Sequence, residues 1–382
     1  MNDPLIYLDN NATTAVAPEC IETMLRCLRD CYGNPSSKHG SGETAKVETI
    51  RARGQLAALL GASPPEIVFT GSGTEATHQA ILGALALRPD KRRIVTSQVE
   101  HPSTLLLLKH LEQEGVEVVY LPVDGEGRLD LDAVDQAMTA DTALVTLMWA
   151  NNETGVVFPI AETAALAAAK GVLFHTDAVQ AVGKTPIDLR ALPVDFLSLS
   201  GHKLHAPKGI GALFVRKGHK IPPLLFGHQE RGRRGSTENV PAIAALGTAA
   251  ELAATGLDGY AAQVAALRER LESGLLAQLP GASINGAGAT RLAGTTSLNL
   301  GGPEAEFVLD KLDRAGIHAS AGAACSATGT EPSHVLLAMG LKPQDALSTI
   351  RFSLSRFTTP REIDHVIRIL PALTPAQPAA AA

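Results

Sequence analysis

Lys203 is the residue with the clearest potential for covalent chemistry in this sequence. It ends the tetrapeptide that begins at Ser200, in a turn rich in glycine that lies between two apolar runs, 194–197 and 212–215. We expect this turn to join two buried strands. Burial disfavours the charged ammonium, and a neutral amine can attack a carbonyl group and form a Schiff base. The hydroxyl of Ser200 and the ring N–H of His202 could bind a phosphate ester beside the lysine.

A carboxylate upstream of Lys203 indicates which chemistry this lysine could take part in. Asp177 follows the strand-forming run 172–176, and open α/β sheets bind their ligands at the carboxyl ends of strands. Enzymes that use pyridoxal 5'-phosphate (PLP) need such a carboxylate, because it keeps the pyridine nitrogen protonated so that the ring can accept electrons. Asp177 and Lys203 together therefore favour a PLP enzyme. A sugar-binding or nucleotide-binding α/β domain is the alternative that these two segments leave open.

Other polar residues also follow predicted strands. His101 and Asn152 stand, like Asp177, between an apolar strand-like run and a helix. This alternation predicts a mostly parallel α/β sheet with its site at the carboxyl ends of the strands. Gly73 and Thr74 lie in a turn just before a further helix, predicted over Ala76–Leu87, whose free N–H groups and positive dipole end make a second candidate for phosphate binding. In this setting His101 becomes a candidate for stacking on an aromatic cofactor.

Composition limits the classes of function. The chain has 382 residues, 45% hydrophobic residues and a net charge of -6, which suggest an ordinary soluble protein of two or three domains. This charge gives no support for binding to nucleic acid or membranes. The start of the chain has no basic and apolar leader pattern, and we see no apolar run close to the roughly 20 residues that a membrane span needs. We therefore expect a cytoplasmic protein.

The pattern of elements changes near residue 260. We expect a large α/β domain over 15–259, and a smaller α+β domain formed by 1–14 and 260–370. Separate helices are predicted from Pro241 to about Ala254 and over 260–279. Residues 371–382 are rich in proline and alanine, and we expect them to form a disordered tail.

The four cysteines are too few for a disulfide framework, in agreement with a reducing compartment. Cys20, Cys27 and Cys31 have helical spacing and lack a Cys-x-x-Cys pair, so we expect a buried face of a helix rather than a metal site. Cys325 differs, because it lies among small residues with no apolar periodicity. We expect a loop with a reachable thiol there.

Taken together, these motifs resemble those of the NifS-like cysteine desulfurases, which are fold-type I PLP enzymes of the class V aminotransferase family. The similarity runs from Tyr7 to about Ile367 and is greatest to the nitrogen-fixation branch. It rests on Tyr-Leu-Asp-Asn-Asn-Ala-Thr-Thr, Gly-Asn-Pro-Ser-Ser, Glu-His-Pro, Asn-Asn-Glu-Thr-Gly, His-Thr-Asp-Ala-Val-Gln, Ser-Gly-His-Lys, His-Gln-Glu-Arg-Gly-Arg-Arg and Arg-Phe-Ser-Leu-Ser-Arg-Phe-Thr-Thr.

The resemblance implies a role for each candidate residue. Lys203 would carry PLP as a Schiff base, Cys325 would accept the sulfur, and Arg351 would bind the substrate carboxylate, with Asn152 beside it. The cofactor would be held at its ring by His101, Asn152, Asp177 and Gln180 and at its phosphate by Thr74, Ser200 and His202, next to Gly73. Thr237 would reach the phosphate from a second subunit, since the family's homodimer places both sites at the subunit interface.

The implied reaction converts L-cysteine to L-alanine and leaves the sulfur on Cys325 as a persulfide. An iron–sulfur scaffold or another acceptor protein would then take this sulfur, for nitrogenase clusters or for general cluster assembly. A selenocysteine lyase and a non-catalytic sulfur-relay partner are the alternatives. The sequence departs from the family near Cys325, where two loop hydroxyls are missing, and at 76–78, where we expect weaker capping of the helix.

Overall fold

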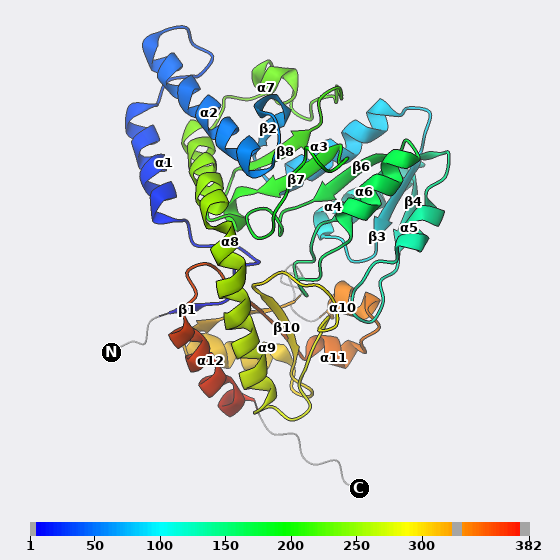
Figure 1. Cartoon of the computed structure of the whole chain (residues 1–382), viewed down its shortest axis with the longest axis vertical. Coiled ribbons are helices and arrows are strands. Elements are labelled where there is room, and N and C mark those ends of the chain that lie inside the picture. The colour runs from blue at the N-terminus through cyan, green and yellow to red at the C-terminus, as the bar shows by residue number, and fades with distance from the viewer. Residues whose placement is uncertain (1–4, 323–330, 375–382) are drawn as a thin grey trace.

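A seven-stranded sheet forms the centre of the larger half of the molecule (Figure 1). The computed structural model describes residues 5–322 and 331–374. Strands β4, β3, β5, β6 and β7 are parallel to one another, whereas β8 is antiparallel to both β7 and β2. This confirms the predicted mostly parallel sheet. The strands, in spatial order, are β2 (Ile67–Thr70), β8 (Gly211–Val215), β7 (Phe196–Ser200), β6 (Leu173–Asp177), β5 (Thr142–Met148), β3 (Arg93–Ser97) and β4 (Glu117–Leu121).

Helices cover both faces of this sheet, and the central strands are therefore buried along their whole length. All seven residues of β5 are buried, as expected for a strand between two layers of helices. Two apolar clusters account for this burial, one including Val145 and Phe174 and the other including Leu144 and Leu173. The helices of this half are α1 (Pro18–Asp30), α2 (Gly40–Leu59), α3 (Gly73–Leu87), α4 (Pro102–Gln113), α5 (Leu131–Ala137), α6 (Ile160–Ala169) and the short α7 (Gln229–Gly232).

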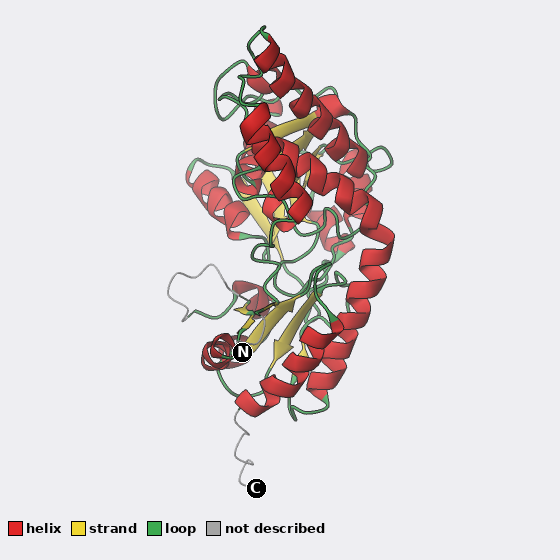
Figure 2. Ribbon diagram, turned by 90° about the vertical axis from the view of Figure 1, so that its left-hand side faces the viewer, coloured by secondary structure: helices red, strands yellow, loops and turns green. Residues whose placement is uncertain are grey.

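A smaller antiparallel sheet of strand order β12-β13-β10-β9 lies below the large one (Figures 1 and 2). Strand β1 near the N-terminus pairs with β11 beside it, so the chain begins and ends its described part in the same half. A separate apolar cluster, which includes Leu8, Leu271 and Phe352, fills this half. Its elements are β1 (Ile6–Tyr7), β9 (Ser283–Ile284), β10 (Thr295–Asn299), α9 (Ala305–Arg314), β11 (Ile317–His318), β12 (Ser320–Ala321), α10 (His334–Ala338), α11 (Pro343–Leu347), β13 (Thr349–Ser353) and α12 (Pro360–Leu373).

One long helix joins the two halves, where we had predicted two. Helix α8 (Val240–Leu276) runs for 37 residues through the expected boundary at residue 260 (Figure 2). Its first part packs in the large core through Leu246, and its last part packs in the small core through Leu271. Burial at both ends outweighs the low helix propensity of the glycines between them. The expected absence of a long apolar run was also wrong, because the window Val240–Leu257 is apolar enough to span a membrane. Half of that window is buried within the structure, as in core helices.

Two helix boundaries also differ from the prediction. Helix α3 begins at Gly73 rather than Ala76, because the Ser72 side chain accepts a hydrogen bond from the Glu75 N–H at 3.1 Å and caps it. The helix thus has its cap upstream of the departures at 76–78. Helix α12 continues through Pro371 to Leu373, past the point where we expected the tail to begin, and residues 375–382 lie outside the described part. The predicted cysteine face is confirmed, since Cys20, Cys27 and Cys31 are all buried.

Candidate active site

Lys203 lies on a tight turn between two buried strands, as predicted. Strand β7 ends at Ser200, a single 3-10 turn covers Gly201–Lys203, and β8 begins at Gly211. The turn packs closely, because a Cβ on Gly201 would lie 2.8 Å from the side chain of Ile210. The Lys203 ammonium points toward the N-terminal loop of the chain. It donates to the main-chain oxygen of Ala12 at 2.6 Å and to that of Asn11.

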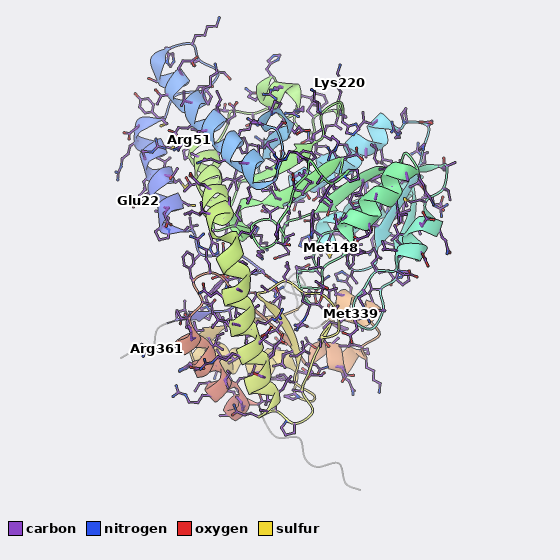
Figure 3. All side chains as sticks on the ribbon, in the orientation of Figure 1. Glu22, Arg51, Met148, Lys220, Met339 and Arg361 are labelled. Carbon is purple, nitrogen blue, oxygen red and sulfur yellow. The ribbon has the colours of Figure 1, made fainter. Side chains whose placement is uncertain are left out.

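The strand-end residues predicted from the sequence surround one cavity of about 630 Å³. Met148, at the end of β5, lines this cavity and lies on the side of the large sheet that faces the smaller half (Figure 3). The structure thus brings together residues from both halves of the molecule. The predicted site residues that line the cavity are Gly73, Thr74, His101, Asn152, Asp177, Gln180, Ser200, His202, Lys203 and Arg351.

Asp177 is the last residue of β6 and is buried at the floor of the cavity. One of its oxygens accepts a hydrogen bond from the Val179 N–H at 2.9 Å. Burial raises the pKa of Asp177 to about 6, although that hydrogen bond and the charge of Lys203 act in the opposite direction. A cationic group placed against Asp177 would favour its ionised form. The environment therefore suits the protonated nitrogen of a pyridine ring.

His101 is the N-cap of α4 and lines the same cavity. Its Nδ1 accepts a hydrogen bond from the Ser103 N–H at 3.1 Å, which fixes the orientation of the ring. Burial, aided by the charges of Lys203 and His334, lowers the pKa of His101 to about 4. The ring is therefore neutral at pH 7. A neutral and oriented imidazole is suited to packing on the face of an aromatic ring.

The start of α3 and the end of β7 form a group of hydrogen-bond donors in the cavity wall. Gly73 and Thr74 present helix N-terminal amides there, and Ser200 and His202 add side chains. A Cβ on Gly73 would lie 3.0 Å from Val179 and 3.2 Å from Ser200, so glycine allows the helix to approach the sheet. Burial, more than the charges of Lys203 and Lys208, lowers the pKa of His202 to about 4. This donor set is of the kind that binds phosphate at helix N-termini.

Arg351 enters the cavity from β13 in the smaller sheet and is only 1% exposed. Its Nη2 donates to the Asp9 carboxylate at 2.6 Å, and its Nη1 donates to the main-chain oxygen of Asn152 at 3.1 Å. Its Nε is buried without a partner among the described residues. Asp9 was not among the predicted site residues. The sequence feature that could have identified Asp9 is its place in a polar run at the end of a strand, which is also how Asp177 was identified.

Asn11 is a second residue that sequence reasoning missed. Its side-chain amide donates to the main-chain oxygen of Asn152 at 3.0 Å and to the Thr295 hydroxyl at 2.9 Å. Its main-chain oxygen accepts from Gln180 Nε2 at 3.0 Å and from Lys203. The N-terminal loop therefore connects the two sheets at the cavity. No periodic pattern in the sequence marks a residue that acts through such contacts.

Cys325 lies outside the described residues, but the chain on either side of it borders the cavity. Gly322 and Glu331 both line the cavity wall. A Cβ on Gly322 would lie 2.5 Å from a carboxylate oxygen of Glu153, and the Ser333 hydroxyl donates to the same oxygen. Burial raises the pKa of Glu153, while Ser333, and more weakly His334 and Arg351, lower it. Glu153 thus contacts both ends of the segment that contains Cys325.

Thr237 does not line this cavity but a smaller one of about 200 Å³, next to Glu230 and Arg234. The Glu230 carboxylate is buried and pairs with Arg53 at 2.7 Å, and Ser236 has a left-handed backbone with φ of 89°. The role of Thr237 toward a second subunit stays a prediction.

The comparisons with known proteins agree with this arrangement. The family model described as aminotransferase class-V matches residues 6–366. A cysteine desulfurase from Trichormus azollae is 51% identical over 97% of this chain and 92% of its own length. The cysteine desulfurase NifS from Azotobacter vinelandii is 49% identical over 96% of this chain and 92% of its own length.

Solved structures lead to the same family. A NifS-like protein superposes with a TM-score of 0.91 at 36% identity, covering 97% of this chain and 99% of that one. SspA, solved in complex with cysteine, superposes with a TM-score of 0.82 at 34% identity over 93% of this chain and 100% of its own. Both matches extend over nearly the whole chain, so they include the two halves and the cavity between them. The chain therefore belongs to the class-V aminotransferase family and, within it, to the NifS-like cysteine desulfurases.

Proposed function

We propose that the protein binds PLP in the 630 Å³ cavity and uses it to remove sulfur from L-cysteine. One observation carries this proposal. The amine of Lys203, the buried carboxylate of Asp177 and the donors at the start of α3 all border the same cavity. These groups match the aldehyde, the ring nitrogen and the phosphate of PLP, respectively. Few other cofactors combine these three chemical demands.

The residues present fit the cofactor in detail. Lys203 would bind its aldehyde carbon, Asp177 its ring nitrogen, and Gln180 and Asn152 its ring oxygen. Gly73, Thr74, Ser200 and His202 would hold its phosphate, and His101 would pack on its ring. When bound, PLP supplies an electron sink for the pair released at the substrate Cα.

Arg351 and Lys203 would handle the substrate itself. The guanidinium of Arg351, held by Asp9 and Asn152, offers its remaining N–H donors to the carboxylate of L-cysteine. The Lys203 amine would take the proton from the substrate Cα and return it later in the reaction. Because Arg351 binds the carboxylate at a fixed place, the Cα is held where Lys203 can reach it.

Cys325 would accept the sulfur. Its thiolate attacks the substrate Sγ, an S–S bond forms, and the Cβ–Sγ bond breaks with its electron pair left on the substrate. Protonation of that carbon gives L-alanine, and a persulfide remains on Cys325. Cys325 is only three positions along the chain from Gly322 in the cavity wall, a span of at most about 11 Å. We further propose a cytoplasmic homodimer in which Thr237 reaches the partner's phosphate site, and transfer of the sulfur to an iron–sulfur scaffold or another acceptor protein.

Borohydride reduction tests the cofactor assignment. The purified protein should be yellow, and reduction should fix PLP to the peptide that contains Lys203. The Cys325→Ala variant should keep the yellow colour and respond spectrally to L-cysteine, yet it should form no persulfide. Cys31→Ala is the matched control, because Cys31 is buried in the core. Label on Lys208 or Lys217, or normal desulfuration by Cys325→Ala, would contradict the proposal.

A further inference from the structure

Lys184 is a second lysine beside the cavity, and none of the roles above uses it. Its Nζ donates to Gln180 Oε1 at 2.9 Å and to Asn11 Oδ1 at 3.3 Å. These two acceptor residues line the 630 Å³ cavity and also contact each other, since Gln180 Nε2 donates to the Asn11 main-chain oxygen. Within 5–322 and 331–374, no carboxylate forms an ion pair with Lys184. Two amide oxygens therefore hold this ammonium.

The charged groups around Lys184 oppose its ionisation. Burial, together with the charges of Lys203 and Arg351, lowers the pKa of Lys184 to about 7. His205 also faces it, and burial lowers the pKa of His205 to about 4. A cation in such a place costs free energy, because it loses water without gaining a carboxylate. Stability alone therefore does not explain why a lysine lies behind Gln180.

The two contacts of the Gln180 amide define its orientation. A glutamine amide has a donor end and an acceptor end of nearly equal size, so it can turn over unless its partners differ in kind. The Asn11 carbonyl only accepts and must face Nε2, and the Lys184 Nζ, which keeps N–H donors in either protonation state, donates to Oε1. Gln180 also lines the 630 Å³ cavity. The second N–H of Nε2 is therefore the group that the amide can offer to a ligand.

We propose that Lys184 is a positioning residue that holds the Gln180 amide with an N–H, rather than its oxygen, toward the ring oxygen of PLP. This inference rests on the proposed function, because it assumes that PLP occupies the cavity. An N–H donor stabilises the deprotonated ring oxygen, whereas an amide oxygen would repel it. Lys184 would thus act on the cofactor without touching it.

The test uses the PLP-loaded protein and its visible absorption band, recorded against pH without substrate. In Lys184→Met the amide loses one of its two fixing contacts and the cavity loses a nearby positive charge. Both changes disfavour the deprotonated form, the loss of the amide contact much more than the loss of the charge, so the midpoint of the spectral titration should rise by about one pH unit. PLP affinity should fall about tenfold, the effect of losing one hydrogen bond at a charged group. Lys184→Arg, which keeps the donors, should stay close to wild type.

A double-mutant cycle separates positioning from charge. If Lys184 acts through the amide, Lys184→Met should have little further effect on the titration midpoint in a Gln180→Met background. A full effect in that background would overturn the inference, because Lys184 would then act directly by its charge. Should Lys184→Met fail to fold, Lys184→Ala carries the same comparison, since Lys184 borders a second cavity of about 400 Å³ that leaves room for water.

The control is Lys170→Met, at the end of α6, where the lysine pairs with Asp135 at 2.8 Å on the surface. It should leave the titration midpoint unchanged. Failure of the two proposals can be distinguished. A wild-type protein that does not bind PLP at Lys203 would overturn the proposed function. A wild-type protein that binds PLP there, with a Lys184→Met titration identical to it, would overturn only this inference.

Discussion

The two ends of the cavity are built in different ways. At the end with Asp177 and Lys203, the functional side chains follow β6 and β7, two neighbouring strands of one sheet. At the end with Arg351, the contacts join residues that are 342 positions apart, to Asp9, and 199 apart, to Asn152. The large sheet alone places Asp177 and the Lys203 turn on neighbouring strands. The second end exists only when the two halves of the molecule pack together, so the proposed substrate site depends on their relative position.

The ends also differ in their electrostatics. Asp177 is a buried carboxylate with a raised pKa, and no described residue forms an ion pair with it. Arg351 is a buried cation that already pairs with Asp9. The first end is thus prepared for a cationic ring, and the second holds its charge in place before any substrate arrives. Changes at the first end should abolish chemistry, whereas changes at the second should weaken substrate binding.

Removal of the amine at the first end should have the largest effect. Lys203→Ala loses both the group that binds the aldehyde and the base for the Cα proton, so turnover of L-cysteine should fall by at least about a thousandfold. Alanine formation by the purified protein measures this. Lys208→Ala, a change at an exposed lysine on the same turn, should leave turnover near wild type. Comparable losses in both variants would mean that the turn, and not the amine, is what matters.

A conservative change at the second end should act on binding. In Arg351→Lys the planar pair of donors becomes a point charge, so KM for L-cysteine should rise about a hundredfold, the worth of a lost bidentate contact. The absorption spectrum of bound PLP should not change. Arg270→Lys is the matched control, because Arg270 pairs with Asp364 on the surface. A loss of PLP from Arg351→Lys would show that the two ends are not separate.

The ion pair behind Arg351 should matter more for stability than for chemistry. Asp9→Asn keeps an oxygen acceptor but leaves the buried guanidinium without its counter-charge, so the free energy of unfolding should fall by about 2 kcal/mol. Urea unfolding measures this. Asp364→Asn breaks the exposed pair with Arg270 and should change the unfolding free energy by less than about 0.5 kcal/mol. Equal effects in the two variants would contradict the contrast between buried and exposed pairs.

The smallest effect concerns Glu100, which lies under the first end. The Ser97 hydroxyl donates to its Oε1 at 2.7 Å, its Oε2 has no partner among the described residues, and burial raises its pKa to about 8. Folding therefore favours the protonated acid, and this stabilisation is lost as pH rises from the ordinary carboxyl pKa through about 8. Glu100→Gln is neutral at every pH.

We expect Glu100→Gln and wild type to have similar unfolding free energies at pH 5. At pH 9 the variant should be more stable by at least about 1 kcal/mol. Thermal unfolding at the two pH values measures the difference. A variant that is less stable than wild type at pH 9 would show that the ionised carboxylate has a partner that the cavity itself provides.

The sequence could predict the first end of the cavity because a strand and its end can be recognised from a short stretch of residues. A run of apolar residues that stops at Asp177 or before the Lys203 turn marks both the strand and its end, and parallel strands bring such ends to one edge. Gly73 and Thr74 were found in the same way, from a strand that stops before a helix. The continuity of α8 could not be found, because Gly256 and Gly259 suggest a break that packing in two cores overrides.

What the sequence by itself determined is therefore which reactive groups follow strands and their order along the chain: the amides at the start of a helix, a carboxylate, a lysine, and then a cysteine among small residues. The tertiary structure alone decided which distant groups hold these residues. Asp9 and Asn11 reach Arg351, Gln180 and Lys203 only because β1 pairs in the smaller half while the following loop enters the cavity. Such contacts depend on how two sheets pack against each other, and no periodic pattern of residues in the sequence indicates that packing.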